Sequence, residues 1–173
     1  MATAFRDFSE YSVGALATVG AADWAVDLTG NWEANIVADG TAEGGQVLQF
    51  DATTSGSGNN FVRFTALDTA GDVEVVAKYR FSAQDNNKVT PCLQAADGQA
   101  YALYRTATTV RLGRFTTNTI STNLDTAVTF NSSENIYYWV RIQRVGTTIR
   151  ARIWADGDTE PATWNAGEGT DST

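Results

Sequence analysis

Three carboxylates alternate with small residues near the end of the chain, at Asp156, Asp158 and Glu160. Calcium takes six to eight oxygen ligands, and acidic side chains at every second position are typical of its loops. In the EF-hand pattern a glycine follows the third acidic position, whereas Pro161 follows here. Calcium is therefore the minority interpretation. The alternatives are a loop that flanks a sugar-binding groove and, as the favoured one, a turn that only connects two strands.

The residue types that the chain lacks exclude several other chemistries. It has no His and a single Cys, Cys92. Ser-His-Asp and Cys-His catalysis, zinc sites built from His and Cys, and an intrachain disulfide are therefore excluded. Oxygen ligands remain, so calcium is the only metal to consider, with Asp7 and Glu10 as additional ligands if the N-terminus lies nearby. Otherwise no cofactor is expected.

Charge and hydropathy exclude two classes of partner. The formal net charge of the 173-residue chain is −8, which argues against nucleic-acid binding because that needs a basic surface. No apolar run is long enough to span a bilayer, so membrane insertion is not expected. The first residues lack the apolar stretch of a signal peptide, so none is predicted. A protein of this kind would reach the outside of a cell by lysis or on a particle.

The elements that must position these residues are strands. Apolar residues recur at every second position, and no stretch keeps a helical period. Turn residues separate these stretches, and the length suits one domain over residues 1–173, so an all-β antiparallel sandwich with almost no helix is expected. The predicted strands are 31–38, 46–51, 61–67, 72–82, 99–105, 109–115, 118–122, 126–130, 136–145 and 148–155.

The clearest pair is 136–145 with 148–155, joined at Gly146 and Thr147 as a tight hairpin. Alternation predicts that Val140, Ile142, Ile149, Ala151 and Ile153 face the core. It puts Trp139, Arg141, Arg150, Arg152 and Trp154 together on the opposite face. In 72–82, alternation turns one set of residues inward and another outward: Val73, Val75, Ala77, Tyr79 and Phe81 inward, and Asp72, Glu74, Lys78 and Arg80 outward.

Residues 137–164 carry three linked motifs. A Trp-Val-Arg strand turns at a glycine, an Arg-x-x-x-Trp strand follows, and a Glu-Pro-x-x-Trp segment comes last. This order resembles the last hairpin of concanavalin A-like, laminin-G-type jelly rolls. Residues 5–24, with an Asp-Phe-Ser leading through glycine to Trp24, resemble the start of the same family, and 72–82 resembles its middle.

The resemblance implies a jelly roll that binds carbohydrate or mediates adhesion more often than it catalyses. Such domains are common on phage particles and bacterial surface proteins. The family usually adds a strand after the Glu-Pro-x-x-Trp segment, but this chain continues only as 167–173. We therefore expect the closing strand to be absent or supplied by another chain, and hence a homo-oligomer, with a trimer favoured.

Two interpretations apply to the polar face of the hairpin. It is either a solvated face of cross-strand ion pairs and Arg–aromatic stacking, which is favoured, or a sugar-binding face. The predicted Trp anchors of the core are Trp24, Trp32 and Trp164. The candidate sugar contacts are Tyr101, Tyr104 and Arg105 on one strand and Trp139, Arg141, Arg152 and Trp154 on the hairpin.

Catalysis is not expected. Glucanases of the resembled family carry a Glu-x-Asp-x-Glu strand, and retaining hydrolysis needs two carboxyl groups about 5–5.5 Å apart. The nearest match, Asp72-Val73-Glu74, lacks the third acid.

The sequence thus predicts a virion-associated, lectin-like protein, in a phage tail or decorating a capsid, which adheres to host-surface glycans. Its expected partners are copies of itself, other virion proteins and surface glycans. Its expected location is the virion, or the medium after lysis. The alternatives are a purely structural particle protein and, less favoured, a polysaccharide-cleaving enzyme.

Overall fold

The computed structural model describes residues 9–15, 24–27, 32–52, 61–64, 72–80, 88–89, 93–94, 99–106, 108–116 and 119–172. The structure is 58% strand and 2% helix, and the helix within the described residues is a single 3₁₀ turn at Glu43–Gly45. The prediction of an all-β antiparallel fold is confirmed. Asp7, Cys92 and the side chains of Trp24 and Trp32 lie outside the described part. No helix in that part is long and apolar enough to cross a membrane.

The chain divides into two compact units, Ala2–Asp68 and Thr69–Thr173. The first unit contains two small antiparallel sheets, one with the order β1-β3-β4 and one that pairs β2 with β5. Their strands are β1 (Gly14–Ala15), β2 (Trp24–Asp27), β3 (Trp32–Ala38), β4 (Gln46–Ala52) and β5 (Phe61–Phe64).

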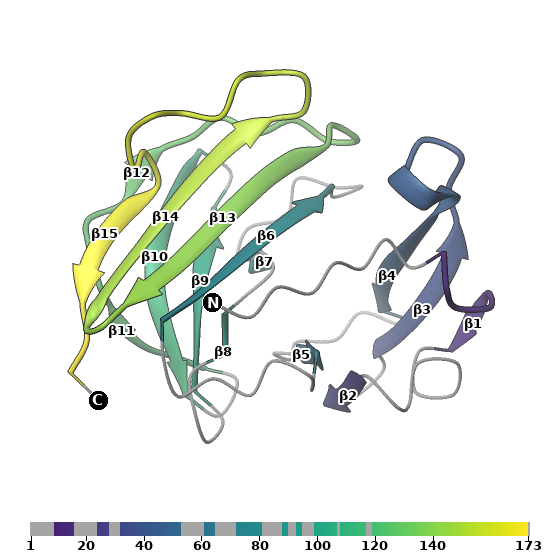
Figure 1. Cartoon of the computed structure of the whole chain (residues 1–173), viewed down its shortest axis with the longest axis horizontal. Helices are drawn as coiled ribbons and strands as arrows, with labels where there is room; N and C mark the ends of the chain where they lie inside the picture. Colours follow the sequence, from purple (N-terminus) through teal and green to yellow (C-terminus); the bar gives the residue numbers. More distant parts are fainter. Residues whose placement is uncertain are drawn as a thin grey trace. The chain divides into compact units, whose positions relative to one another are not determined.

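The second unit is a sandwich of two antiparallel sheets (Figure 1). One sheet has the order β15-β14-β13-β6; these are Gly167–Thr170, Thr148–Ala155, Tyr138–Val145 and Val73–Tyr79. The other has the path β11-β10-β9-β7, with β12 beside β10 and β8 beside β9. Its strands are β7 (Lys88–Val89), β8 (Leu93–Gln94), β9 (Gln99–Arg105), β10 (Thr109–Thr116), β11 (Thr119–Asn123) and β12 (Val128–Thr129).

The core of the second unit lies between the two sheets. Val140 and Ile142 on β13 and Ile149 on β14 are fully buried, and they pack with Leu103 on β9 and Leu112 on β10. Burial of such aliphatic side chains contributes roughly 1.5–3 kcal/mol each to the free energy of folding. The inward face predicted for the hairpin is therefore confirmed.

The hairpin that joins β13 to β14 has the predicted register. Val145 pairs with Thr148, and pairing continues to Tyr138 opposite Ala155. Gly146 occupies the turn with φ of 56°, a conformation that glycine adopts without steric cost. Its N–H donates a 2.7 Å hydrogen bond to the Asp72 carboxylate, which ties the turn to the start of β6.

A strand at residues 167–170 was not predicted. β15 pairs with β14 from Ala151 to Thr148, so the chain does contain a strand after the Glu-Pro-x-x-Trp segment. The expectation of an oligomer rested on the absence of such a strand, and this ground is removed.

The two glycines of β15 explain why the strand escaped prediction, because glycine normally weakens strands. Gly167 has φ of 123°, a conformation that favours glycine, and Gly169 lies against the backbone of Leu124. A Cβ on Gly167 would lie 1.7 Å from Asp125 Oδ2, and one on Gly169 would lie 2.4 Å from the Leu124 carbonyl oxygen.

An ion pair fixes the segment that follows β15. Asp171 accepts a 2.9 Å hydrogen bond from Arg114 Nη1 on β10, and its backbone N–H donates to the Thr147 carbonyl at 2.8 Å. The Tyr101 hydroxyl donates to the same carboxylate at 3.3 Å. Burial, and then the negative charge of Asp171, raise the pKa of Tyr101. These contacts hold the chain end against both sheets.

Candidate functional site

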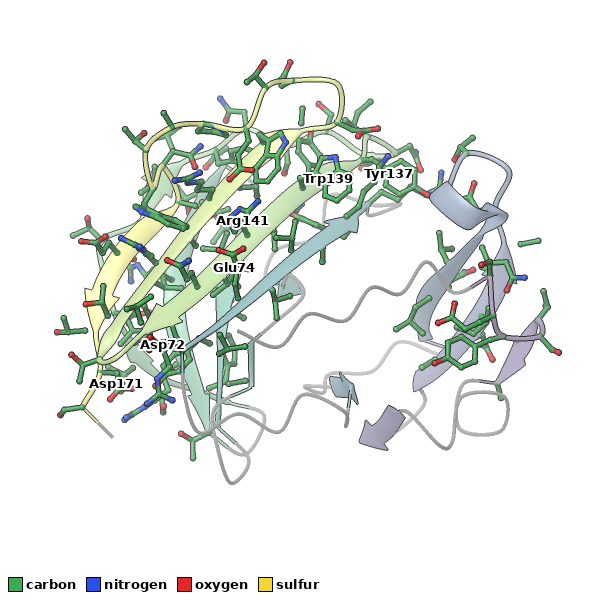
Figure 2. The ribbon with its side chains drawn as sticks, viewed as in Figure 1. Asp72, Glu74, Tyr137, Trp139, Arg141 and Asp171 are labelled. Atoms are coloured by element: carbon green, nitrogen blue, oxygen red, sulfur yellow. The ribbon has the colours of Figure 1, made fainter. Side chains whose placement is uncertain are left out.

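The outer face of the four-stranded sheet carries the polar and aromatic side chains that alternation predicted. Figure 2 shows Trp139 and Arg141 on β13, with Glu74 beside Arg141 on β6. Two parts of this face differ in chemistry. We call the first the charged half, made of Glu74, Arg141, Gln143, Arg150, Arg152, Glu160 and Trp164. We call the second the aromatic half, made of Lys78, Tyr137, Trp139, Trp154 and Asp156.

Arg141 is the hub of the charged half. Its guanidinium donates to both carboxylate oxygens of Glu160, from Nε at 2.7 Å and from Nη2 at 3.0 Å. Its remaining Nη1 forms an ion pair with Glu74. A bidentate arginine–carboxylate pair is a strong and geometrically specific contact. Arg141 thus links β6, β13 and the loop after β14.

The other members of the charged half extend this network. Arg152 Nη1 donates to Glu160 at 2.7 Å. Gln143 accepts from Arg150 Nε at 2.8 Å and donates to Glu74 at 2.9 Å. These bonds use both the donors and the acceptors of the amide, so the strands β6, β13 and β14 are connected side chain to side chain.

Trp164 covers this network. Its ring lies 4.4 Å from the Arg150 Cζ and 4.2 Å from the Arg152 Cζ, within cation–π distance. The prediction that Trp164 anchors the core is wrong, because it packs on the outer arginines. The loop that carries the three carboxylates connects β14 to β15, which agrees with the favoured interpretation of a connecting turn.

The aromatic half centres on two parallel indole rings. Trp139 and Trp154 are directly opposite each other on β13 and β14, with ring centroids 6.3 Å apart and an interplanar angle of 13°. Both side chains are half-buried. Trp139 Nε1 donates a 2.8 Å hydrogen bond to Asp156, which fixes the orientation of its ring. The pair forms an apolar surface at the end of the sheet where β14 finishes.

Cations flank a third ring in the aromatic half. Lys78 Nζ lies 5.0 Å from the Tyr137 ring centroid and 5.4 Å from that of Trp139. The same Nζ forms a 2.8 Å ion pair with Asp156. Arg80, which is exposed, also contacts the Tyr137 ring, with its Cζ 5.2 Å from the ring centroid. Aromatic rings with polar groups at their edges are the residue types that bind sugar rings, whose C–H faces are apolar and whose rims carry hydroxyls.

The alternating carboxylates that suggested calcium point to different partners. Hydrogen bonds from Lys78 and then Trp139 lower the pKa of Asp156. Hydrogen bonds from Arg141 and then Arg152 lower the pKa of Glu160. Among the described residues no three acidic, His or Cys side chains converge as metal ligands. Two of the three carboxylates already neutralise cations of the protein, and calcium at these positions stays the minority prediction.

The prediction that Tyr101 and Arg105 on β9 contact a sugar is wrong. Tyr101 and Arg105 are 0% exposed, so a ligand in solution cannot reach them. Both residues lie on the face of β9 that points to the core. Tyr104 lies on the opposite face of β9 and is half-buried. All three also belong to the other sheet, not to the sheet of the hairpin. Arginine and tyrosine in a central strand resembled surface residues only because the sequence does not give the position of a strand in its sheet.

The hairpin candidates divide between the two halves. Trp139 and Trp154 form the parallel pair, whereas Arg141 and Arg152 are held by Glu160. Tyr137, Lys78 and Asp156 belong to the aromatic half and were not predicted as sugar contacts. Alternation had already placed Lys78 on the outward face, and Tyr137 lies two positions before Trp139 and so on the same face, so both could have been added to the candidates.

The two acids that most resembled a catalytic pair have structural partners. Asp72 caps the hairpin turn, and Glu74 binds Arg141 and Gln143. A nucleophile or general acid must be able to approach its substrate and exchange protons with it. The arrangement of Asp72 and Glu74 gives them the role of connecting strands.

Comparison of the chain with family models, with curated proteins and with solved structures found no match. The jelly-roll family that residues 137–164 resemble stays a prediction. The fold is established as an all-β antiparallel sandwich, and function has to be argued from the outer face itself.

Proposed function

We propose that the sandwich unit is a glycan-binding module and that its aromatic half is the binding surface. The observation that carries this proposal is the parallel Trp139–Trp154 pair, which is half-buried on the outer face and is oriented by the Asp156 carboxylate. A sugar ring would stack its C–H face on the indoles, and its hydroxyls would meet Asp156 and Lys78.

The charged half supports this assignment by contrast. Its arginines and carboxylates are already paired with one another, so a ligand there would have to replace strong bonds with bonds of equal strength. Binding that only exchanges hydrogen bonds gives little net affinity. The aromatic half instead offers apolar surface, whose removal from water is favourable.

The experiment is a glycan-array screen followed by calorimetry on three proteins: wild type, Trp139→Ala and Trp164→Ala. Trp164 is the matched control, because it also lies on the outer face but stacks on Arg150 and Arg152. We expect the Trp139 variant to lose at least about tenfold in affinity, equivalent to ~1.4 kcal/mol, and the Trp164 variant to bind like wild type. Circular dichroism checks that each variant is folded.

Two results would contradict the proposal: no glycan binds the wild type, or both variants bind it equally well. The first result favours the second candidate function, a structural particle protein without a ligand. The ion-pair network of the charged half is the observation in its favour, because it connects three strands on the outer surface through side chains.

We further propose that the protein acts on a virus particle, as a tail or decorating component that holds host-surface glycans, and that it is not an enzyme. The support is the resemblance of residues 137–164 to jelly rolls that are common on phage particles. Immunogold labelling of purified particles with an antibody against this chain tests the location. Label on the particles is expected, and label confined to the unassembled fraction would contradict it.

A further inference from the structure

A pocket of about 380 Å³ opens beside the end of β14. Small-molecule sites in proteins usually enclose roughly 300–1,000 Å³, so its size suits one small ligand or one unit of a larger ligand. Phe130 and Asn131, before β13, line it together with Asp158 and Thr159 from the loop after β14. Tyr138 and Trp154 add aromatic surface.

Three polar residues of this lining are exposed: Asn131, Asp158 and Thr159. Within the described part of the chain, their side chains form no hydrogen bond or ion pair. They can therefore serve a ligand. An amide supplies two N–H donors and an acceptor, a hydroxyl supplies one donor and accepts, and a carboxylate accepts. This set of groups matches a ring that carries several hydroxyls.

Asp158 differs in this respect from its two alternating neighbours. Asp156 pairs with Lys78, and Glu160 pairs with Arg141 and Arg152. The short run of acids therefore has two roles. The outer two carboxylates attach the loop to the sheet, and the middle carboxylate is left at the pocket.

The charge of the lining restricts the ligand. Asp158 is its one ionisable carboxylate, and no Lys or Arg contributes to it. An anionic group would meet a negative charge without a compensating cation, which is unfavourable. A neutral, hydroxyl-rich unit can pack on the aromatic surface and satisfy the three polar side chains.

Trp154 connects the pocket to the aromatic half, because it lines the pocket and also stacks parallel to Trp139. We infer that the pocket is a second subsite, which holds one neutral sugar unit of the same glycan that stacks on the Trp139–Trp154 pair. This inference rests on the proposed function. It adds a ligand class, a neutral oligosaccharide of at least two units.

The test is calorimetry with tetrasaccharides as probes: β-1,4-linked glucose, α-1,4-linked glucose and β-1,4-linked N-acetylglucosamine as neutral probes, and tetragalacturonate as an anionic probe. The proteins are wild type, Asp158→Ala, Asn131→Ala and Trp139→Ala. Glu168→Ala is the matched control, because it removes an exposed carboxylate from β15 at a distance from the pocket lining.

We expect at least one neutral tetrasaccharide to bind the wild type and tetragalacturonate to bind more weakly. Loss of Asp158 or Asn131 should weaken binding about five- to tenfold, as expected when a ligand hydrogen bond is removed. The Glu168 variant should bind like wild type, and the Trp139 variant should lose most binding.

Two outcomes separate the inference from the proposed function. If Trp139→Ala abolishes binding while Asp158→Ala and Asn131→Ala leave it unchanged, the pocket is not a subsite and the aromatic half remains the binding surface. If tetragalacturonate binds best, the neutral-sugar class is wrong. If no probe binds the wild type at millimolar concentration, both proposals fall for these glycans.

Discussion

The charged half and the aromatic half lie on the same face of the same three strands, yet their side chains are used differently. In the charged half, Arg141 and Arg152 share Glu160, and Gln143 uses both ends of its amide. In the aromatic half, Trp139 is hydrogen-bonded at the edge of its ring, where its N–H donates to Asp156. A polar surface that satisfies itself contributes to stability, and an apolar surface with polar edges remains available for a ligand. We therefore expect substitutions in the two halves to affect different measurements.

The inner face of the same hairpin gives the scale for stability. Ile142 is fully buried between the sheets, so Ile142→Ala should lower the free energy of unfolding by roughly 2–5 kcal/mol. Urea denaturation measures this change. Val76→Ala on the exposed outer side of β6 is the control and should cost much less. A loss below about 0.5 kcal/mol for Ile142→Ala would mean that the face assignment of β13 is wrong.

Substitution of Arg141 should produce the largest change in the free energy of unfolding within the charged half. Arg141→Ala leaves Glu74 and Glu160 without their main partner, so we expect a loss of roughly 1–3 kcal/mol, below the cost for a fully buried pair because the side chain is partly exposed. Arg141→Lys retains the charge but not the bidentate geometry and should recover part of the loss. Glycan affinity should be unchanged. A large fall in affinity with intact stability would place ligand binding in the charged half.

Glu160→Gln should cost about 1 kcal/mol at neutral pH, as expected for a charge-assisted, partly exposed pair, and the cost should depend on pH. Arg141 and then Arg152 hold the pKa of Glu160 below its usual range. The contribution of a carboxylate with a lowered pKa is complete above its unfolded-state pKa and is lost as the pH falls through the folded-state pKa.

The difference in unfolding free energy between wild type and Glu160→Gln should therefore be constant from pH 8 to about pH 5 and shrink below about pH 4. Chemical denaturation across this range measures it. A difference that grows as the pH falls would contradict the assigned sign.

The smallest stability effect is expected in the aromatic half. Asp156 is 39% exposed, and surface ion pairs contribute little, so Asp156→Asn should change the free energy of unfolding by about 0.5 kcal/mol or less. If the carboxylate orients Trp139 for a sugar, the variant should nevertheless bind glycan more weakly. A stability loss as large as that of Arg141→Ala would remove the distinction between the two halves.

The sequence predicted the hairpin well because two local signals agreed. Alternation assigned Ile142 and Ile153 to the core, and Gly146 marked the turn. Strands 99–105 and 148–155 were predicted with the observed bounds. These features depend on neighbours along the chain, which a sequence displays directly.

Other features depended on contacts between distant segments. Gly167 and Gly169 argue against a strand until Leu124 and Asp125 are seen to approach them. Tyr101 and Arg105 look like surface residues until β9 is seen between β10 and β7. The spacing of the three alternating carboxylates did not indicate that two of them form ion pairs with Lys78 and Arg141. Spacing along the chain alone could not identify these contacts.

The central claim is that the Trp139–Trp154 pair binds glycan, and the indole N–H signals in proton–nitrogen correlation spectra test it most directly. The chain has five Trp residues, so five indole signals are expected, and single Trp→Phe variants assign them. Titration with the neutral glycan that ranks first in the array should shift the Trp139 and Trp154 signals and leave Trp164 in place. Shifts of Trp164 with Trp139 and Trp154 unchanged would contradict the account.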